Sequence, residues 1–291
     1  MDEREFARIK LKEAKKPMMA MFKEQKKDRR LYGREMIIPV GDKEYKCWYQ
    51  PGEGEITGLY FDIHGGGFTW GTKEDGDIFC HEIREQLGFA CFGLDYPLTT
   101  QAEFPVQLDV LYEIIAEIRK MEKFKAASKC MVIGGRSAGG NLAAALCYLA
   151  KERGEFRFNL QILDHPWLDL CDHIQEERYS GTEALDQEIL YGMRLGYAPR
   201  ELWRDKLVSP VMVSEEEMQG LPAAIIQTCN LDFLQPDGKF YAKKLEKAGI
   251  PVSYHDFPGV VHGFSEDIKP ESEEGRQWLI SRMKQYLKKQ G

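Results

Sequence analysis

The sequence predicts an α/β protein built on one mostly parallel, eight-stranded sheet flanked by helices. Short apolar runs rich in β-branched and aromatic residues alternate with amphipathic stretches of helical length. From Thr57 onward the order is strand then helix, which requires right-handed crossovers and parallel neighbours. We expect residues 1–291 to form a single domain, because α/β folds often reach roughly 200 to 250 residues in one unit.

Eight segments have the composition of strands. The first two are separated by Gly41, Asp42 and Lys43, which predicts an antiparallel hairpin at the edge of the sheet. The strands are expected at Glu35–Val40, Tyr45–Gln50, Thr57–Ile63, Ala90–Asp95, Cys130–Gly134, Asn159–Asp164, Ala223–Thr228 and Val252–Phe257. Helices are expected at Asp75–Leu87, Phe104–Lys120, Ala138–Glu152, Pro236–Ala248 and Glu271–Gln290.

Two segments interrupt the alternation, and we interpret them as one helical cap over a site at the sheet edge. Residues 1–32 are lysine-rich, with a helical pattern whose apolar side comprises Phe6, Ile9, Met18, Met19, Met21 and Phe22. Residues 167–206 contain a helix expected at Leu185–Tyr197, which carries Leu190, Tyr191, Met193 and Leu195. Most of these apolar side chains should pack inward, with charged residues facing solvent.

Composition narrows the class of protein. Hydrophobic residues make up 43% of the chain and charged residues 30%, which indicates a soluble globular protein. The net charge of -7 argues against a nucleic-acid partner. The sequence has neither the apolar run of a secretory signal nor the roughly 18 apolar residues of a membrane span, so we expect a cytoplasmic protein. A homo-oligomer is compatible with these features.

The seven cysteines are odd in number and scattered, several of them inside apolar runs such as Ala90–Leu94. This usage favours buried free thiols in a reducing compartment over disulfides. Cys171 and His173 stand close together, but no second pair follows at ligand spacing. We therefore expect no metal site.

A nucleophile is predicted at Ser137. The strand Cys130–Gly134 runs directly into Gly135-x-Ser137-x-Gly139 and then into a helix. A serine at such a turn has a strained backbone that the flanking glycines permit, and its hydroxyl projects from the C-terminal edge of the sheet. The sequence here lacks the Gly-Lys-Ser/Thr of a phosphate-binding loop and the glycine spacing of a dinucleotide site.

A binding site for an oxyanion is predicted where the strand Thr57–Ile63 runs into His64-Gly65-Gly66-Gly67-Phe68. Backbone NH groups without side chains can approach the negative oxygen of a tetrahedral intermediate closely, each being worth roughly 3 to 4 kcal/mol. We expect the donors to be Gly66, Gly67 and Ala138, the residue after the nucleophile. His64 is expected to hydrogen-bond within its own loop rather than act as a base.

A serine hydroxyl needs a base to take its proton. Of the six histidines, His262 is the predicted base, because it follows the last strand and precedes the last helix, where a loop can reach back over the sheet edge. The alternatives are placed less well, since His255 lies within a strand. The remaining candidates lack a comparable position: His81, His165 and His173.

The base in turn needs an acid to orient it. Asp232 follows the strand Ala223–Thr228 and is the predicted acid. The chain order is then Ser, Asp, His, which is the order found in α/β hydrolases. Three rivals remain on nearby segments, namely Asp237, Asp256 and Asp267.

Together these motifs resemble the hormone-sensitive-lipase-like branch of the α/β hydrolases, which contains microbial carboxylesterases and acetyl esterases. The likeness covers about residues 57–290 and rests on His64–Phe68, Asp95-Tyr96 followed by Phe104-Pro105, the Ser137 turn, Leu207–Pro210, Asp232 and His262–Phe264. It implies a two-part cap, a pocket between cap and sheet edge, an acyl-enzyme mechanism without cofactor and a preference for short acyl chains. One departure is Arg136, which stands where the family usually has aspartate and changes the local electrostatics.

The function expected from these features is hydrolysis of a small-molecule carboxylic ester. Ser137, activated by His262 and Asp232, would attack the ester, and water would release the acid from an acyl-enzyme. One alternative is an amidase or arylformamidase with the same triad, because the triad does not choose the leaving group. Another is a small-molecule receptor on a hydrolase scaffold, since fold does not fix function.

Overall fold

The computed structural model describes residues 3, 5–7, 9–13, 30–51, 54–181 and 185–289. Its eight strands form one sheet in the order β1-β2-β4-β3-β5-β6-β7-β8, antiparallel at β1-β2-β4 and parallel elsewhere. The strands are β1 Arg34–Val40, β2 Lys43–Gln50, β3 Leu59–Ile63, β4 Ala90–Leu94, β5 Met131–Arg136, β6 Leu160–Asp164, β7 Ala223–Leu231 and β8 Val252–Val261. The predicted fold class and the hairpin at the sheet edge are thereby confirmed.

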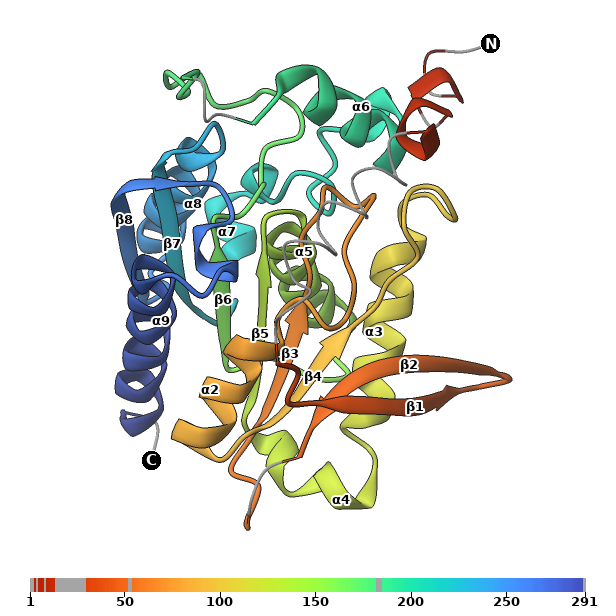
Figure 1. Cartoon of the computed structure of the whole chain (residues 1–291), viewed down its shortest axis with the longest axis vertical. Helices are drawn as coiled ribbons and strands as arrows, with labels where there is room; N and C mark the ends of the chain where they lie inside the picture. Colours follow the sequence, from red (N-terminus) through yellow and green to blue (C-terminus); the bar gives the residue numbers. More distant parts are fainter. Residues whose placement is uncertain are drawn as a thin grey trace.

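Helices cover both faces of this sheet (Figure 1). Helices α2 and α9 pack on one face, and α3, α5 and α8 pack on the other. The α-helices are α2 Asp77–Leu87, α3 Val106–Ile118, α4 Glu122–Lys125, α5 Ala138–Arg153, α6 Gln187–Tyr197, α7 Glu215–Met218, α8 Gln235–Lys247 and α9 Pro270–Lys288. Short 3₁₀ helices are η1 Ala127–Lys129, η2 Arg200–Leu202, η3 Pro210–Met212 and η4 Phe264–Glu266.

The sheet separates two apolar layers. The larger lies on the α3, α5 and α8 side and continues into the segment between β6 and β7. The smaller lies under α2 and α9, where Phe79 and Ile83 of α2 meet Leu279 and Ile280 of α9. The central strands β3 to β6 are buried along their whole length, which explains why their sequences are mainly apolar.

Strands β7 and β8 extend past their predicted ends, Thr228 and Phe257. Asn230 and Gly259, just beyond those ends, are residues that favour turns. In the structure the Asn230 side chain accepts a hydrogen bond from the Gly259 amide at 2.7 Å, and pairing resumes at Leu231 after an irregularity. The extension carries the residues after both strands beyond the C-terminal edge of the sheet.

Helix α6 and the described N-terminal helical residues lie together above that edge (Figure 1). Tyr191 of α6 donates to the Glu3 carboxylate at 2.7 Å. Leu11 packs against Gly196, where an added Cβ would lie only 3.0 Å from the leucine side chain. On the N-terminal segment Leu11 is buried, whereas Phe6 and Ile9 are exposed. The predicted apolar positions Met18, Met19, Met21 and Phe22 lie outside the described residues, and the extent of the cap stays a prediction.

All seven cysteines are free thiols, and five of them are buried. Within the described part of the chain, no helix combines the length and the apolar character needed to cross a membrane.

Candidate active site

Ser137 occupies a strained turn between β5 and α5. Its backbone angles are φ 53° and ψ -119°, a region that non-glycine residues enter at a cost of about 1–3 kcal/mol. The flanking glycines are required by space, because a Cβ on Gly135 would lie 2.2 Å from the Gly139 oxygen and one on Gly139 would lie 2.1 Å from the Ile63 oxygen. The Ser137 amide donates to the Asp164 carbonyl at 3.0 Å, which ties the turn to β6.

Three of the predicted site residues meet at this turn. His262 Nε2 lies 2.9 Å from Ser137 Oγ, and His262 Nδ1 lies 2.7 Å from Asp232 Oδ2. Asp232 is 1% exposed, and its other oxygen accepts the Leu234 amide at 3.0 Å. With Nδ1–H donating to the carboxylate, Nε2 is left as the acceptor for the serine proton. The geometry thus allows proton transfer from Ser137, while the catalytic role of each residue stays a prediction.

The rival acids hold other positions. Asp237 accepts the amides of Leu168 and Asp169 at 2.9 Å each and pairs with Arg178 at 2.8 Å, so it fastens the segment after β6 to α8. Burial raises the pKa of Asp237 to about 7, although the charge of Arg178 opposes that shift. Asp256 accepts from the Thr228 hydroxyl, and Asp267 pairs with Lys269 on the surface.

The predicted oxyanion loop lies against the nucleophile turn. Gly66 and Gly67 both have positive φ, 95° and 58°, and a Cβ on Gly65 would lie 3.4 Å from the Ser137 Cβ. The Thr69 hydroxyl donates to the Gly67 carbonyl at 3.0 Å, which fixes the loop. Among the hydrogen bonds described for this loop and turn, none uses the amides of Gly66, Gly67 or Ala138 as donors. These amides are available to a substrate oxygen.

His64 serves the loop in the way that the sequence predicts. Its Nδ1 donates to the Gly65 carbonyl at 2.8 Å, and its ring stacks on Tyr96 with centroids 4.3 Å apart. The ring is 1% exposed, and these two contacts hold the loop in place.

Helix α6 covers the oxyanion loop. Tyr197, its last residue, stacks on Phe68 with ring centroids 3.8 Å apart and planes 6° from parallel. Met193, one turn earlier, packs on Gly67 so closely that an added Cβ would lie 2.0 Å from its sulfur. The predicted helix in residues 167–206 therefore contacts the loop directly.

Arg136, the residue before the nucleophile, directs its charge into the protein. Its guanidinium makes two hydrogen bonds to Asp62 of β3, at 2.9 and 2.7 Å, and both side chains are nearly inaccessible to solvent. Gly76 leaves room for this pair, because a Cβ there would lie 1.9 Å from Asp62 Oδ2. The Arg136 charge is therefore neutralised by Asp62 inside the protein.

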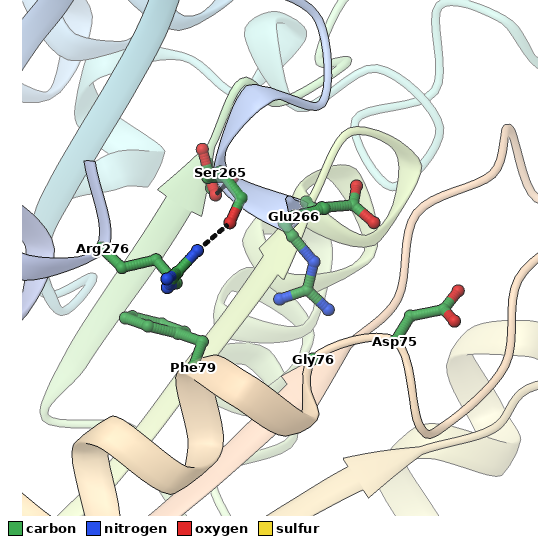
Figure 2. A pocket seen from close by; sticks show the side chains of 8 residues that line it. Asp75, Gly76, Phe79, Ser265, Glu266 and Arg276 are labelled. Atoms are coloured by element: carbon green, nitrogen blue, oxygen red, sulfur yellow. Dashed lines mark hydrogen bonds between the residues drawn. The ribbon is translucent and has the colours of Figure 1, made fainter. Parts of the chain in front are cut away.

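A small polar cavity lies next to Arg136 on the α2 side of the sheet. Figure 2 shows Arg276 of α9 donating to the Ser265 carbonyl in its wall, with Glu266 beside them. Its lining comprises Asp75, Gly76, Phe79, Arg136, Asp164, Ser265, Glu266 and Arg276. The cavity lies behind the loop that carries His262.

Sequence reasoning missed one neighbour of the predicted triad. It set His165 aside, yet the His165 ring centroid lies 4.6 Å from that of His262. The sequence does place Asp164-His165 at the end of a strand. Because the C-terminal ends of adjacent parallel strands lie at one edge of the sheet, this position indicates that His165 lies at the same edge as Ser137. His81, His173 and His255 instead contact Tyr32, Phe240 and Trp278, respectively, away from Ser137.

Comparison with known proteins gives one family. A model of the family described as alpha/beta hydrolase fold matches residues 60–266. A carboxylic ester hydrolase of Mycobacterium tuberculosis, LipN, is 27% identical over 82% of this chain and 66% of its own length, just under two thirds. An ethyl acetate hydrolase of Pseudomonas putida is 28% identical over 77% of this chain and 72% of its own length.

Solved structures show the same architecture. A thermostable carboxylesterase cloned from a metagenomic library superposes with a TM-score of 0.85 at 22% identity, over 95% of this chain and 97% of its own. A bacterial heroin esterase has a TM-score of 0.82 at 26% identity, over 96% and 93% of the two chains.

If Asp232 orients His262, Asp232→Asn should lower kcat by about 10⁴-fold, because the amide favours the wrong imidazole tautomer. The rate of p-nitrophenyl acetate hydrolysis measures this loss. Asp267→Asn, at the exposed rival position, should retain wild-type activity. The reverse ranking would refute the assignment of Asp232.

The buried Asp62–Arg136 pair predicts a stability effect. Arg136→Met should lower the free energy of unfolding by about 3–5 kcal/mol, because Asp62 is left buried without its cation. Adding Asp62→Asn should restore most of that loss. Arg153→Met, which breaks a half-exposed pair with Asp109, should cost less than about 1 kcal/mol. Chemical denaturation measures all four proteins, and equal losses for the two arginine variants would contradict the interpretation.

Proposed function

Because the chain belongs to the alpha/beta hydrolase fold family, we propose that it is a serine carboxylesterase acting on esters of short acyl groups, acetyl esters among them. The observation that carries the proposal is the continuous hydrogen-bonded series Asp232, His262, Ser137. The amides of Gly66 and Gly67 lie on the loop packed against it. The relatives named as a carboxylic ester hydrolase and an ethyl acetate hydrolase support the same reaction class.

The reaction proceeds in two halves. Ser137 Oγ attacks the ester carbonyl while His262 takes the proton of the serine hydroxyl. Asp232 stabilises the resulting imidazolium. The amides of Gly66, Gly67 and Ala138 bind the oxyanion, each contributing roughly 3 to 4 kcal/mol to the transition state. His262 then protonates the departing alcohol. In the second half it activates the water that releases the acid from Ser137.

The cap supports a preference for short acyl groups. Met193 of α6 is 6% exposed and fills the space directly over Gly67. Tyr197 is fully buried against Phe68 of the same loop. A long acyl chain that extends from the carbonyl carbon toward α6 would have to displace these packed side chains, whereas the methyl of an acetyl group would not.

Replacing the nucleophile tests the reaction. Ser137→Ala should abolish hydrolysis of p-nitrophenyl acetate down to a residual rate at least about 10⁴-fold below wild type, because no acyl-enzyme can form. Ser281→Ala, a serine exposed on α9, should have no effect. Comparing the wild-type rate on p-nitrophenyl acetate with the rate on the matched anilide separates an esterase, which should be faster on the ester, from an amidase. Near wild-type ester hydrolysis by Ser137→Ala would disprove the proposal.

Shortening Met193 tests the acyl preference. Met193→Ala should raise the rate on decanoyl relative to acetyl ester by about tenfold or more, because the side chain that blocks the longer chain is removed. The measurement is kcat/KM on acetyl, butyryl and decanoyl p-nitrophenyl esters. Ile189→Ala, on an exposed position of the same helix, should leave the ratio unchanged. An unaltered ratio for Met193→Ala would argue against this limit on chain length.

A further inference from the structure

A second histidine–carboxylate pair lies directly beside the first. His165 follows β6, and its Nδ1 lies 2.7 Å from Asp164 Oδ1. Its ring meets that of His262 edge to face, with centroids 4.6 Å apart and planes at 79°. His165 is 1% exposed and has a positive φ of 38°, a conformation supported by the hydrogen bond that its backbone amide donates to the Gln227 carbonyl at 2.8 Å. The ring is therefore held in place from its backbone.

Asp164 is built to remain ionised. Besides His165 it accepts hydrogen bonds from Gln227 Nε2 at 2.6 Å and from Ser265 Oγ. Ser265 lies three residues after His262 on the same loop, so this carboxylate also fastens the loop of the proposed base. Burial alone would raise the pKa of Asp164, but the attraction of His165 and the three hydrogen bonds lower it below its usual value.

The charges around His165 favour its imidazolium form. His165 Nε2 lies 3.9 Å from the Glu266 carboxylate and has no hydrogen-bond partner among the described residues. Burial lowers the pKa of His165, but the attraction of Asp164 outweighs it, and Glu266 and Asp232 add to the upward shift. The two nearby arginines have other partners. Arg136 of β5 binds Asp62. Arg276 of α9 binds Glu82 and the carbonyls of Ser265 and Asp267.

We propose that His165, charged by Asp164, is a positioning residue for His262: it walls the imidazole into contact with Ser137 and keeps it unprotonated at lower pH. A positive charge at this distance opposes a second positive charge on His262, which counteracts the effect of Asp232. An unprotonated His262 can accept the serine proton, so activity extends into more acidic solution. The inference rests on the proposed ester hydrolysis, in which His262 is the base.

The test is the pH dependence of kcat/KM for p-nitrophenyl acetate in His165→Asn. Asparagine tolerates a positive φ, and its amide can donate to Asp164, so mainly the ring and its charge are lost. The midpoint of the acidic limb should rise by about one pH unit because the charge is lost. The alkaline plateau should fall as well, because the ring that holds the His262 imidazole against Ser137 is lost. His255→Asn, an exposed histidine on β8, should leave the midpoint unchanged. An unmoved midpoint in His165→Asn overturns the proposal.

A second measurement does not depend on activity or on the folding of that variant. In Ser137→Ala protein carrying ¹⁵N-labelled histidine, the ring in contact with His262 should still be doubly protonated at a pH of about 6.5, where an unperturbed histidine is half neutral. A neutral ring at that position overturns the proposal. An absence of ester hydrolysis by the wild-type protein would instead refute the proposed function, while this titration would still decide the charge of His165.

Discussion

The strained turn at Ser137 is the constraint on which the arrangement of the site depends. The positive φ of Ser137 places its hydroxyl beyond the sheet edge. This conformation is possible only where the neighbouring backbone segments have no side chains between them. Gly135 and Gly139 provide this space against each other and against the end of β3. Because β3 continues into the predicted oxyanion loop, the crowding that strains Ser137 also sets the distance between Ser137 and the amides of that loop.

Three buried carboxylates described near the site have charged or polar partners, and through these partners each joins segments that are far apart in sequence. Asp62 and Arg136 link β3 to β5, Asp237 and Arg178 link α8 to the segment after β6, and Asp164 joins β6, β7 and the His262 loop. A buried charge without its partner is strongly destabilising, so each pair favours one arrangement of its segments over alternatives. The precision of the site is thus supported by groups that take no part in the proposed chemistry.

The alternation of apolar runs and helical patterns was sufficient to predict all eight strands, because the central strands are buried on both faces. The glycine motifs predicted Ser137 and its loop, since few other structures need glycines at those spacings. The ends of β7 and β8 were missed because a side chain, Asn230, replaces a backbone partner there. The contact of His165 with His262 was missed because the two residues are 97 positions apart, and the strand-end position of Asp164-His165 shows which edge of the sheet His165 occupies but not which side chain it meets there.

The contact between the N-terminal segment and α6 has a consequence for synthesis of the chain. Glu3 and Tyr191, which hydrogen-bond to each other, are 188 residues apart. At about 5–20 residues per second, the N-terminal residues are synthesised roughly 10 to 40 seconds before their partner helix. Through that interval Leu11 has no α6 to pack against. The contact between these two segments therefore forms late, after the strands up to β6 have been made, and nascent chains stalled before residue 187 should lack it.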